Sequence, residues 1–210
     1  MLLYKFREPS QIEFTLDIMF NDRLYCADWT MLNDPMEGQF VYSHRSTDEV
    51  DRSAHLDDIR TEKKKVRICS LSSTYDSHLL WAHYADGFSG VAIEVDIPDN
   101  HPSLVKMEYG GVFTNVNFQD INVPRETARR IFASKYIDWS YEKEFRILHG
   151  EHFFELPNPV RRIIVGHRMN PSLFEALRII CERKDIEIYR TGIGDEGIDA
   201  DSVPALGELW

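Results

Sequence analysis

The sequence predicts an α+β fold with a mainly antiparallel β-sheet core flanked by four or five helices. Strand-like and helix-like segments interleave without the strict alternation of a doubly wound parallel sheet. Hairpin-like neighbouring strands are expected between Glu142 and Val165. Of the 210 residues, 43% are hydrophobic, which supplies an ordinary core and excludes a fully disordered chain. We expect a single domain over 1–210, with an acidic C-terminal tail from about residue 192.

The first forty residues predict a strand, a capped helix and a second strand. Residues 2–5 have a strand-like pattern. Ser10 and Glu13 then match a capping box, in which the hydroxyl accepts a first-turn N–H and the carboxylate reaches back. The helix that they start is expected to end near Phe20. Residues 24–29 follow as a short strand.

The central part predicts an exposed helix, three strands and a short aromatic helix. Residues 47–65 are highly charged, which indicates a helix exposed to solvent. A second helix is expected over 77–84, with Asp76 as its cap. Apolar or alternating runs predict the strands, and these cover 66–72, 91–95 and 105–109.

The C-terminal part predicts two helices and further strands. Pro124 suits the first turn of a helix that reaches about Tyr136. Asn170 and Pro171 start another helix, and its apolar stripe faces the core. The strands expected here cover 139–148, 153–156, 161–165 and 186–190.

Composition and charge exclude several classes of protein. Lys and Arg number 24 and Asp and Glu number 35, giving a net charge of −11, so the chain is a poor passive binder of nucleic acid. No apolar run is long enough to cross a membrane, and no membrane partner is expected. Cys26, Cys69 and Cys181 are far apart and lie in apolar stretches, so buried free thiols in a reducing cytoplasm are expected. Nothing in the sequence specifies an oligomeric state.

Hydroxyl side chains end one expected strand, and a helix rich in aromatic residues follows. Trp81 and Tyr84 are three residues apart and share a helical face, with His83 between them. This combination is typical of a pocket wall on which a ligand stacks. Alternatively, the two rings belong to the core and a backbone carbonyl satisfies His83. Both interpretations stay open, and the candidate ligand-binding residues here are Ser72, Trp81, His83 and Tyr84.

A pair of carboxylates marks a second candidate site. On the expected strand 139–148, Glu142, Glu144 and Arg146 share one face because they alternate. Adjacent carboxylates repel, which raises the pKa of one, and such pairs recur at acid–base sites. Alternatively, Arg146 neutralises Glu144 in an ion-paired face. Glu144 and then Glu142 are the candidate catalytic residues.

These motifs together resemble a bacterial family, the domain-of-unknown-function 2971 family. The resemblance spans most of the chain and includes Lys135. The motifs that carry it, in chain order, are Leu3-Tyr4-Lys5-Phe6-Arg7, Asn33-Asp34-Pro35-Met36-Glu37, Ser70-Leu71-Ser72, Leu80 to Val91 and Trp139 to Arg146. The resemblance implies a bacterial cytosolic domain and assigns no catalytic residue.

A weaker resemblance links the chain to the ADP-ribosyltransferases. These enzymes carry an early Arg or His, a central Ser or Tyr motif and a late Glu, preceded in one branch by a second Glu. The corresponding residues here, in the same order, are Arg7 (or Lys5), Ser70 and Ser72, and Glu142-Lys143-Glu144. The resemblance implies NAD as the cofactor and a nucleotide as the small-molecule partner.

The same resemblance implies a role for each matched residue. Arg7 would hold a phosphate or ribose of NAD, and Ser72 would support the ribose pocket. Glu144 would accept a hydrogen bond from the ribose 2′-OH and stabilise the oxocarbenium-like transition state, since a carboxylate stabilises the positive charge that develops there. Glu142 would orient the acceptor.

Two other classes of function remain open. One is a non-catalytic binding or regulatory module, in bacterial stress or phage defence, because no strong catalytic fingerprint is present. The other is a hydrolase or nuclease in which His83, Asp86, Glu142 and Glu144 hold magnesium or manganese. The spacing of the histidines alone predicts no metal site, since His78 and His83 miss the i, i+4 spacing.

Overall fold

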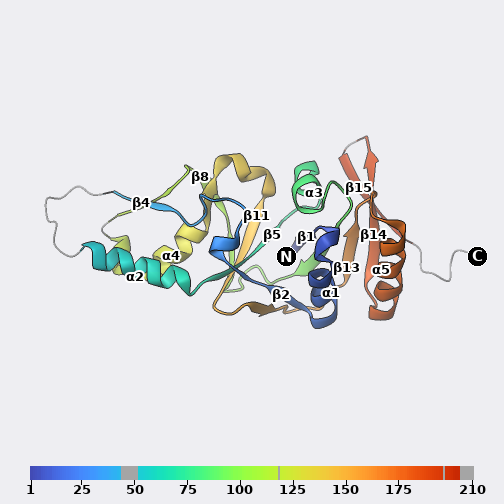
Figure 1. Cartoon of the computed structure of the whole chain (residues 1–210), viewed down its shortest axis with the longest axis horizontal. Helices are drawn as coiled ribbons and strands as arrows, with labels where there is room; N and C mark the ends of the chain where they lie inside the picture. Colours follow the sequence, from blue (N-terminus) through green and yellow to red (C-terminus); the bar gives the residue numbers. More distant parts are fainter. Residues whose placement is uncertain (44–51, 118, 196, 204–210) are drawn as a thin grey trace, which may run out of the picture.

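The computed structural model describes residues 1–43, 52–117, 119–195 and 197–203 (Figure 1). Its main sheet comprises β1 (Leu2–Arg7), β3 (Ala27–Asp28), β5 (Arg67–Ser72), β6 (Val91–Asp96), β7 (Leu104–Lys106), β11 (Glu144–His149), β13 (Arg162–Val165), β14 (Glu187–Gly194) and β15 (Gly197–Ser202). The strand order is β15-β14-β13-β6-β1-β5-β11-β7, and β3 also pairs with β5. Only the β13–β14 pair in this described sheet is parallel, so the predicted α+β fold with a mainly antiparallel sheet is confirmed.

Helices and three small strand pairs surround this sheet. The helices are α1 (Ile12–Asn21), α2 (Arg52–Lys64), α3 (His78–Tyr84), α4 (Pro124–Phe132) and α5 (Pro171–Lys184). The strand pairs are β2 (Arg23–Tyr25) with β12 (Phe153–Glu155), β4 (Phe40–Tyr42) with β9 (Thr114–Val116), and β8 (Glu108–Gly110) with β10 (Ser134–Tyr136). In Figure 1, α2, α4 and β4 lie at one end of the molecule, and α5 with β14 and β15 at the other. No helix in the described ranges has the length and apolar character that a bilayer requires.

Local sequence signals set the helix starts, with two exceptions. Asn170 caps α5 as predicted, because its side chain accepts the N–H groups of Ser172 and Leu173. The capping box predicted at Ser10 is wrong, since its hydroxyl donates to Glu8 and a 3₁₀ turn over Pro9–Gln11 precedes α1. The cap predicted for α3 is also wrong.

Ser77 takes the place of Asp76 as the cap of α3. The Ser77 hydroxyl accepts the N–H of Leu80 at 3.5 Å. The Asp76 carboxylate instead accepts the N–H of Ile198 in β15, at 3.3 Å. The carboxylate is thus used to hold the C-terminal hairpin against the loop before α3.

The structure differs from the prediction at the C-terminal tail and at the strand predicted over 139–148. The chain does not become a tail at residue 192, because β14 runs to Gly194 and β15 pairs with it over six positions. Gly194 faces Gly197, and glycines at this turn allow the hairpin. Residues 204–210 lie outside the described ranges. The strand predicted over 139–148 begins only at Glu144, after a 3₁₀ segment over Ile137–Glu142 and a left-handed Lys143.

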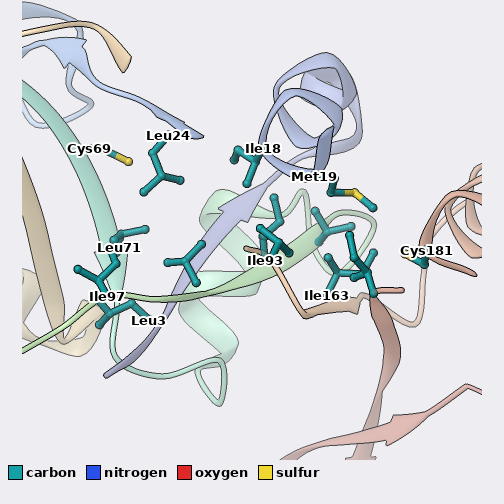
Figure 2. Close-up of a cluster of buried hydrophobic side chains, with 14 of the residues drawn as sticks. Leu3, Ile18, Met19, Leu24, Cys69, Leu71, Ile93, Ile97, Ile163 and Cys181 are labelled. Carbon is teal, nitrogen blue, oxygen red and sulfur yellow. The ribbon is translucent and has the colours of Figure 1, made fainter. Parts of the chain in front are cut away.

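The hydrophobic core occupies both faces of the main sheet. Alternate residues of β1 point to opposite faces, so Leu3 joins one cluster while Tyr4 and Phe6 join another. Figure 2 shows the first cluster, where Ile18 and Met19 of α1 lie over the sheet residues. The second cluster lies against α3. The strand β1 is therefore covered on both sides, and its polar residues must lie within the fold.

Candidate functional site

A cavity of about 250 Å³ lies beside β1, where the main sheet is incomplete. The strands β1 and β5 pair only at Tyr4 and Ser72. On the same edge of β5, β3 pairs with Ile68 and Arg67. The strand edge between these two contacts has no strand partner on this side, and the cavity occupies the resulting gap. Its polar lining comprises Lys5, Arg7, Asn33, Ser70, Ser72, Tyr84, Lys135, Glu142 and Glu144.

A buried ion network lies at one wall of the cavity. Arg146 donates from Nε to Glu144 Oε1 at 2.6 Å and from a terminal nitrogen to Glu37. Lys135 Nζ lies 3.2 Å from Glu144 Oε2, 2.6 Å from Glu142 Oε2 and 3.5 Å from Glu37 Oε1. Each of the five side chains is at least 94% buried. Lys135 therefore joins three carboxylates that come from three separate segments.

Neighbouring segments of the chain hold the carboxylates of Glu142 and Glu37 in place. Tyr84 of α3 donates to Glu142 Oε1 at 2.5 Å and accepts from Asn33 at 2.7 Å. Glu37 follows a turn in which the Asp34 carboxylate accepts the N–H of Met36 at 2.9 Å. This Asx turn carries the Glu37 carboxylate into the network.

Charge and burial give the network members different pKa values. Burial opposes ionisation of Glu144, but Arg146 and Lys135 outweigh it and lower its pKa to about 2. Burial raises the pKa of Glu142, and Lys135 only partly offsets this effect. Burial would lower the pKa of Lys135, yet Glu144, Glu37 and Glu142 together raise it. Glu142 is therefore more easily protonated than Glu144.

Two other cations at the cavity wall lack carboxylate partners. Lys5 Nζ donates to the Ser70 carbonyl at 2.9 Å. Arg7 donates to the Gln11 side chain at 3.3 Å, and its Nε is buried without a hydrogen-bond partner. Neither forms an ion pair within the described residues. Burial lowers the pKa of both groups, and at Lys5 the charge of Glu144 offsets only part of this effect.

The structure brings five of the seven candidate residues to one cavity. Arg7, Ser72, Tyr84, Glu142 and Glu144 all line it. The Ser72 hydroxyl donates to the backbone carbonyl of Glu142 at 2.7 Å, so it fixes the segment that carries the carboxylate.

The other two candidates do not line this cavity. Trp81 is fully buried, stacks on Phe88 with 5.4 Å between ring centroids, and donates to the Tyr75 carbonyl. It belongs to the core, as the alternative interpretation held. His83 is exposed, and its ring lies 6.3 Å from that of Tyr141. The predicted backbone partner of His83 is therefore not needed, since water reaches the ring.

Sequence reasoning assigned no role to Lys135 and no partner to Glu37. Lys135 lies seven residues before Glu142 and nine before Glu144, and this spacing across a strand and a 3₁₀ segment gives no periodic signal. Glu37 is about a hundred residues from Arg146 and is found only by the fold. The only sequence signal for Lys135 was the presence of two glutamates shortly after it in the chain.

The metal hypothesis gains no support from this geometry. His83 and Asp86 are both exposed and lie outside the cavity lining. Between Glu142 and Glu144 lies the Lys135 ammonium, at the place where a bridging cation would bind. In the part of the chain that the structure describes, no three His, Cys, Asp or Glu side chains are grouped to hold a metal ion.

No protein-family model, curated protein or solved structure matches this chain. The resemblances to the domain-of-unknown-function 2971 family and to the ADP-ribosyltransferases therefore stay predictions, and the site is interpreted from its own geometry.

Replacing Arg146 with methionine is expected to destabilise the protein strongly. The variant leaves Glu37 and Glu144 buried without this cation, and breaking a buried pair typically costs about 3–5 kcal/mol. Urea denaturation followed by tryptophan fluorescence measures the loss. Arg161→Met is the matched control, because its ion pair with Asp185 is exposed and is worth about 0–1 kcal/mol. Equal effects of the two variants would contradict the proposed importance of the network.

Acid is expected to destabilise the protein through Glu144. Its folded pKa of about 2 is below its ordinary value of 4.5, so the ionised group stabilises the fold above pH 4.5. That stabilisation, about 3 kcal/mol at most, is lost as the pH falls toward 2. The unfolding free energy of Glu144→Gln, measured across this range, should fall less steeply than that of the wild type. Exposed Glu108→Gln should follow the wild type, and parallel curves for all three would rule out this origin.

Proposed function

We propose that the protein binds a small anionic molecule, bearing a phosphate or a similar group, in the gap between β1 and β5. The observation that supports this proposal is the contrast between two sets of cations. Lys135 and Arg146 are neutralised by carboxylates, whereas Lys5 and Arg7 line the same cavity without one. A desolvated cation without a counter-ion is costly, and a bound anion would offset part of that cost.

The size of the cavity limits the ligand. Pockets for drug-sized molecules have volumes of roughly 300–1,000 Å³, and this cavity of about 250 Å³ is slightly smaller. It suits a nucleoside monophosphate or a sugar phosphate, or one end of a dinucleotide. Tyr25 and Tyr84 contribute aromatic surface to the lining, and Leu32 and Leu80 contribute apolar surface. A phosphate at the cations would leave these side chains to contact a base or a ring.

The ion network favours binding over catalysis as the primary role. Glu144 is held by Arg146 and Lys135, and its charge is already compensated. A carboxylate in this state fixes the shape of the wall. Such a wall gives specificity through a fixed charge pattern, as expected for a binding or regulatory module.

NAD-dependent ADP-ribosyl transfer is the second candidate function. The observation that favours it is that Arg7, Ser72, Glu142 and Glu144, the residues matched by the resemblance, line one cavity. The raised pKa of Glu142 also suits a group that exchanges a proton. Only one end of NAD would enter the cavity, with its phosphates near Arg7.

Binding of phosphate-bearing ligands should depend on Lys5 and Arg7. We expect isothermal titration calorimetry to detect at least one of AMP, nicotinamide mononucleotide and ribose 5-phosphate, and not adenosine. Lys5→Met and Arg7→Met should each weaken the affinity at least about 10-fold, since a charge-assisted hydrogen bond contributes about 1.5–3 kcal/mol. Exposed Lys106→Met is the control and should bind like the wild type. No binding of any phosphate, or full binding by Arg7→Met, would refute the proposal.

Measuring nicotinamide release distinguishes ligand binding from ADP-ribosyl transfer. The full chain is incubated with NAD, and free nicotinamide is followed by liquid chromatography. If the second candidate is correct, release should occur and fall at least about 100-fold in Glu144→Gln, because the carboxylate can no longer stabilise positive charge. Exposed Glu108→Gln should retain the rate. Ligand binding without release, in wild type and both variants, would support the binding role alone.

A further inference from the structure

Two cysteines that are far apart in the sequence face each other next to the cavity. Cys26 lies between β2 and β3, and Cys69 lies in β5. The register pairs Ala27 with Ile68 and Asp28 with Arg67, so one further step places Cys26 opposite Cys69. Both cysteines belong to the same buried cluster, and their sulfurs lie 4.0 Å from the carbonyls of Leu24 (for Cys26) and Ser70 (for Cys69).

The backbone geometry of this pair suits a disulfide. The N–H of Cys26 donates to the His152 carbonyl at 2.7 Å, and the Cys26 carbonyl lies 3.2 Å from His152 Nδ1. Both backbone groups of Cys26 therefore point away from β5, which makes Cys26 and Cys69 a non-hydrogen-bonded pair. The Cα atoms of such pairs are about 4.5 Å apart, and disulfides span about 4.4–6.8 Å.

The surroundings of Cys69 favour its thiolate. A hydrogen bond from the Cys26 thiol lowers the pKa of Cys69, and the charges of Lys5 and Arg7 lower it further, so that burial is outweighed and the pKa is about 6. The pKa of Cys26 is raised, first by its hydrogen bond with Cys69 and then by burial. The two shifts act in opposite directions, so the thiolate is favoured on Cys69 rather than on Cys26.

The cavity is the route by which a small oxidant reaches the pair. The sulfur-bearing residues are 0% and 1% exposed, which excludes bulky thiols such as glutathione. Ala27, Ile68 and Ser70 are chain neighbours of the cysteines, and all three line the cavity, as does Lys5. Figure 2 shows Cys69 at the β5 side of the core, close to Leu24. A small hydroperoxide that enters the cavity therefore reaches residues adjacent to both cysteines, although neither cysteine lines the cavity itself.

We propose that Cys26 and Cys69 form a redox-active pair that hydrogen peroxide converts to a disulfide. The Cys69 thiolate attacks one peroxide oxygen, the O–O bond breaks, and hydroxide leaves, giving a sulfenic acid at Cys69. The Cys26 sulfur then attacks that sulfur, the S–O bond breaks, and the Cys26 proton leaves with the hydroxyl as water. Two thiols and one peroxide yield one disulfide and two waters, and the sulfurs supply both electrons.

The third cysteine is a matched control within the chain. Cys181 of α5 is 1% exposed, as buried as Cys69. Burial alone raises its pKa to about 12, and within the described residues it has neither a thiol nor a cation to offset this. It should stay a thiol at neutral pH and react slowly. Burial is thus equal at the two sites, and only the charge and the neighbouring thiol differ.

The experiment counts thiols after exposure of the full chain to hydrogen peroxide at pH 7. The protein is then denatured with N-ethylmaleimide, and its mass is measured. We expect one alkylated cysteine in the oxidised chain and three after dithiothreitol, with peptide mapping joining Cys26 to Cys69. Cys181→Ser should still form the bond, and Cys26→Ser should not. Lys5→Met should slow the reaction at least about 10-fold at pH 7, and Lys5→Arg should restore the rate.

Three outcomes would overturn the proposal: three alkylated cysteines after peroxide, oxidation of Cys181 at the same rate as Cys69, or disulfides only between chains. Circular dichroism of each variant before oxidation confirms that it is folded, and the wild-type mass result alone decides the proposal if a variant is not. No ligand enters the measurement. Failure here therefore leaves the anion-binding proposal intact, and failure of that proposal leaves this one intact.

Discussion

The arrangement of the cavity depends on the ion network centred on Lys135 and Arg146. Its carboxylates come from the loop before β4, the 3₁₀ segment before β11 and β11 itself. Arg146 also donates to the Phe132 carbonyl at 3.0 Å, which links the end of α4 to the sheet. Buried ion pairs contribute little net stability compared with apolar side chains of the same volume. We infer that their main effect is positional, since each carboxylate must meet a cation at one place.

The cavity forms because one edge of β5 pairs with two different strands. The edge of β5 pairs with β1 at one end and with β3 at the other, and neither strand covers the residues between. A gap in a sheet must be lined by side chains, and here they include cations of β1. The chain thus places neutralised charges on one wall and uncompensated charges on the other. This asymmetry, rather than any single residue, supports binding of an anion.

Sequence patterns predicted the elements that are determined by a few consecutive residues. The apolar run of β6 and the Asn170 cap of α5 are examples, because alternation and capping act over a few residues. The position of Glu142 could not be predicted in this way. Its segment alternates like a strand, but a left-handed Lys143 separates it from β11. The pairing of Arg146 with Glu144 was predicted from their alternate positions and is present. The contact of Glu37 with Arg146 and the gap were inaccessible, since both depend on pairings between residues tens of positions apart.

Lys5 has a further consequence for the behaviour of the folded chain. A carbonyl on a strand edge that no strand covers needs a donor from elsewhere, because a buried backbone group without a partner is costly. The Lys5 ammonium donates to the Ser70 carbonyl on the uncovered part of β5. The side chain therefore completes the hydrogen bonding of the neighbouring strand at the gap. Replacing Lys5 would remove a charge and a backbone partner at the same place.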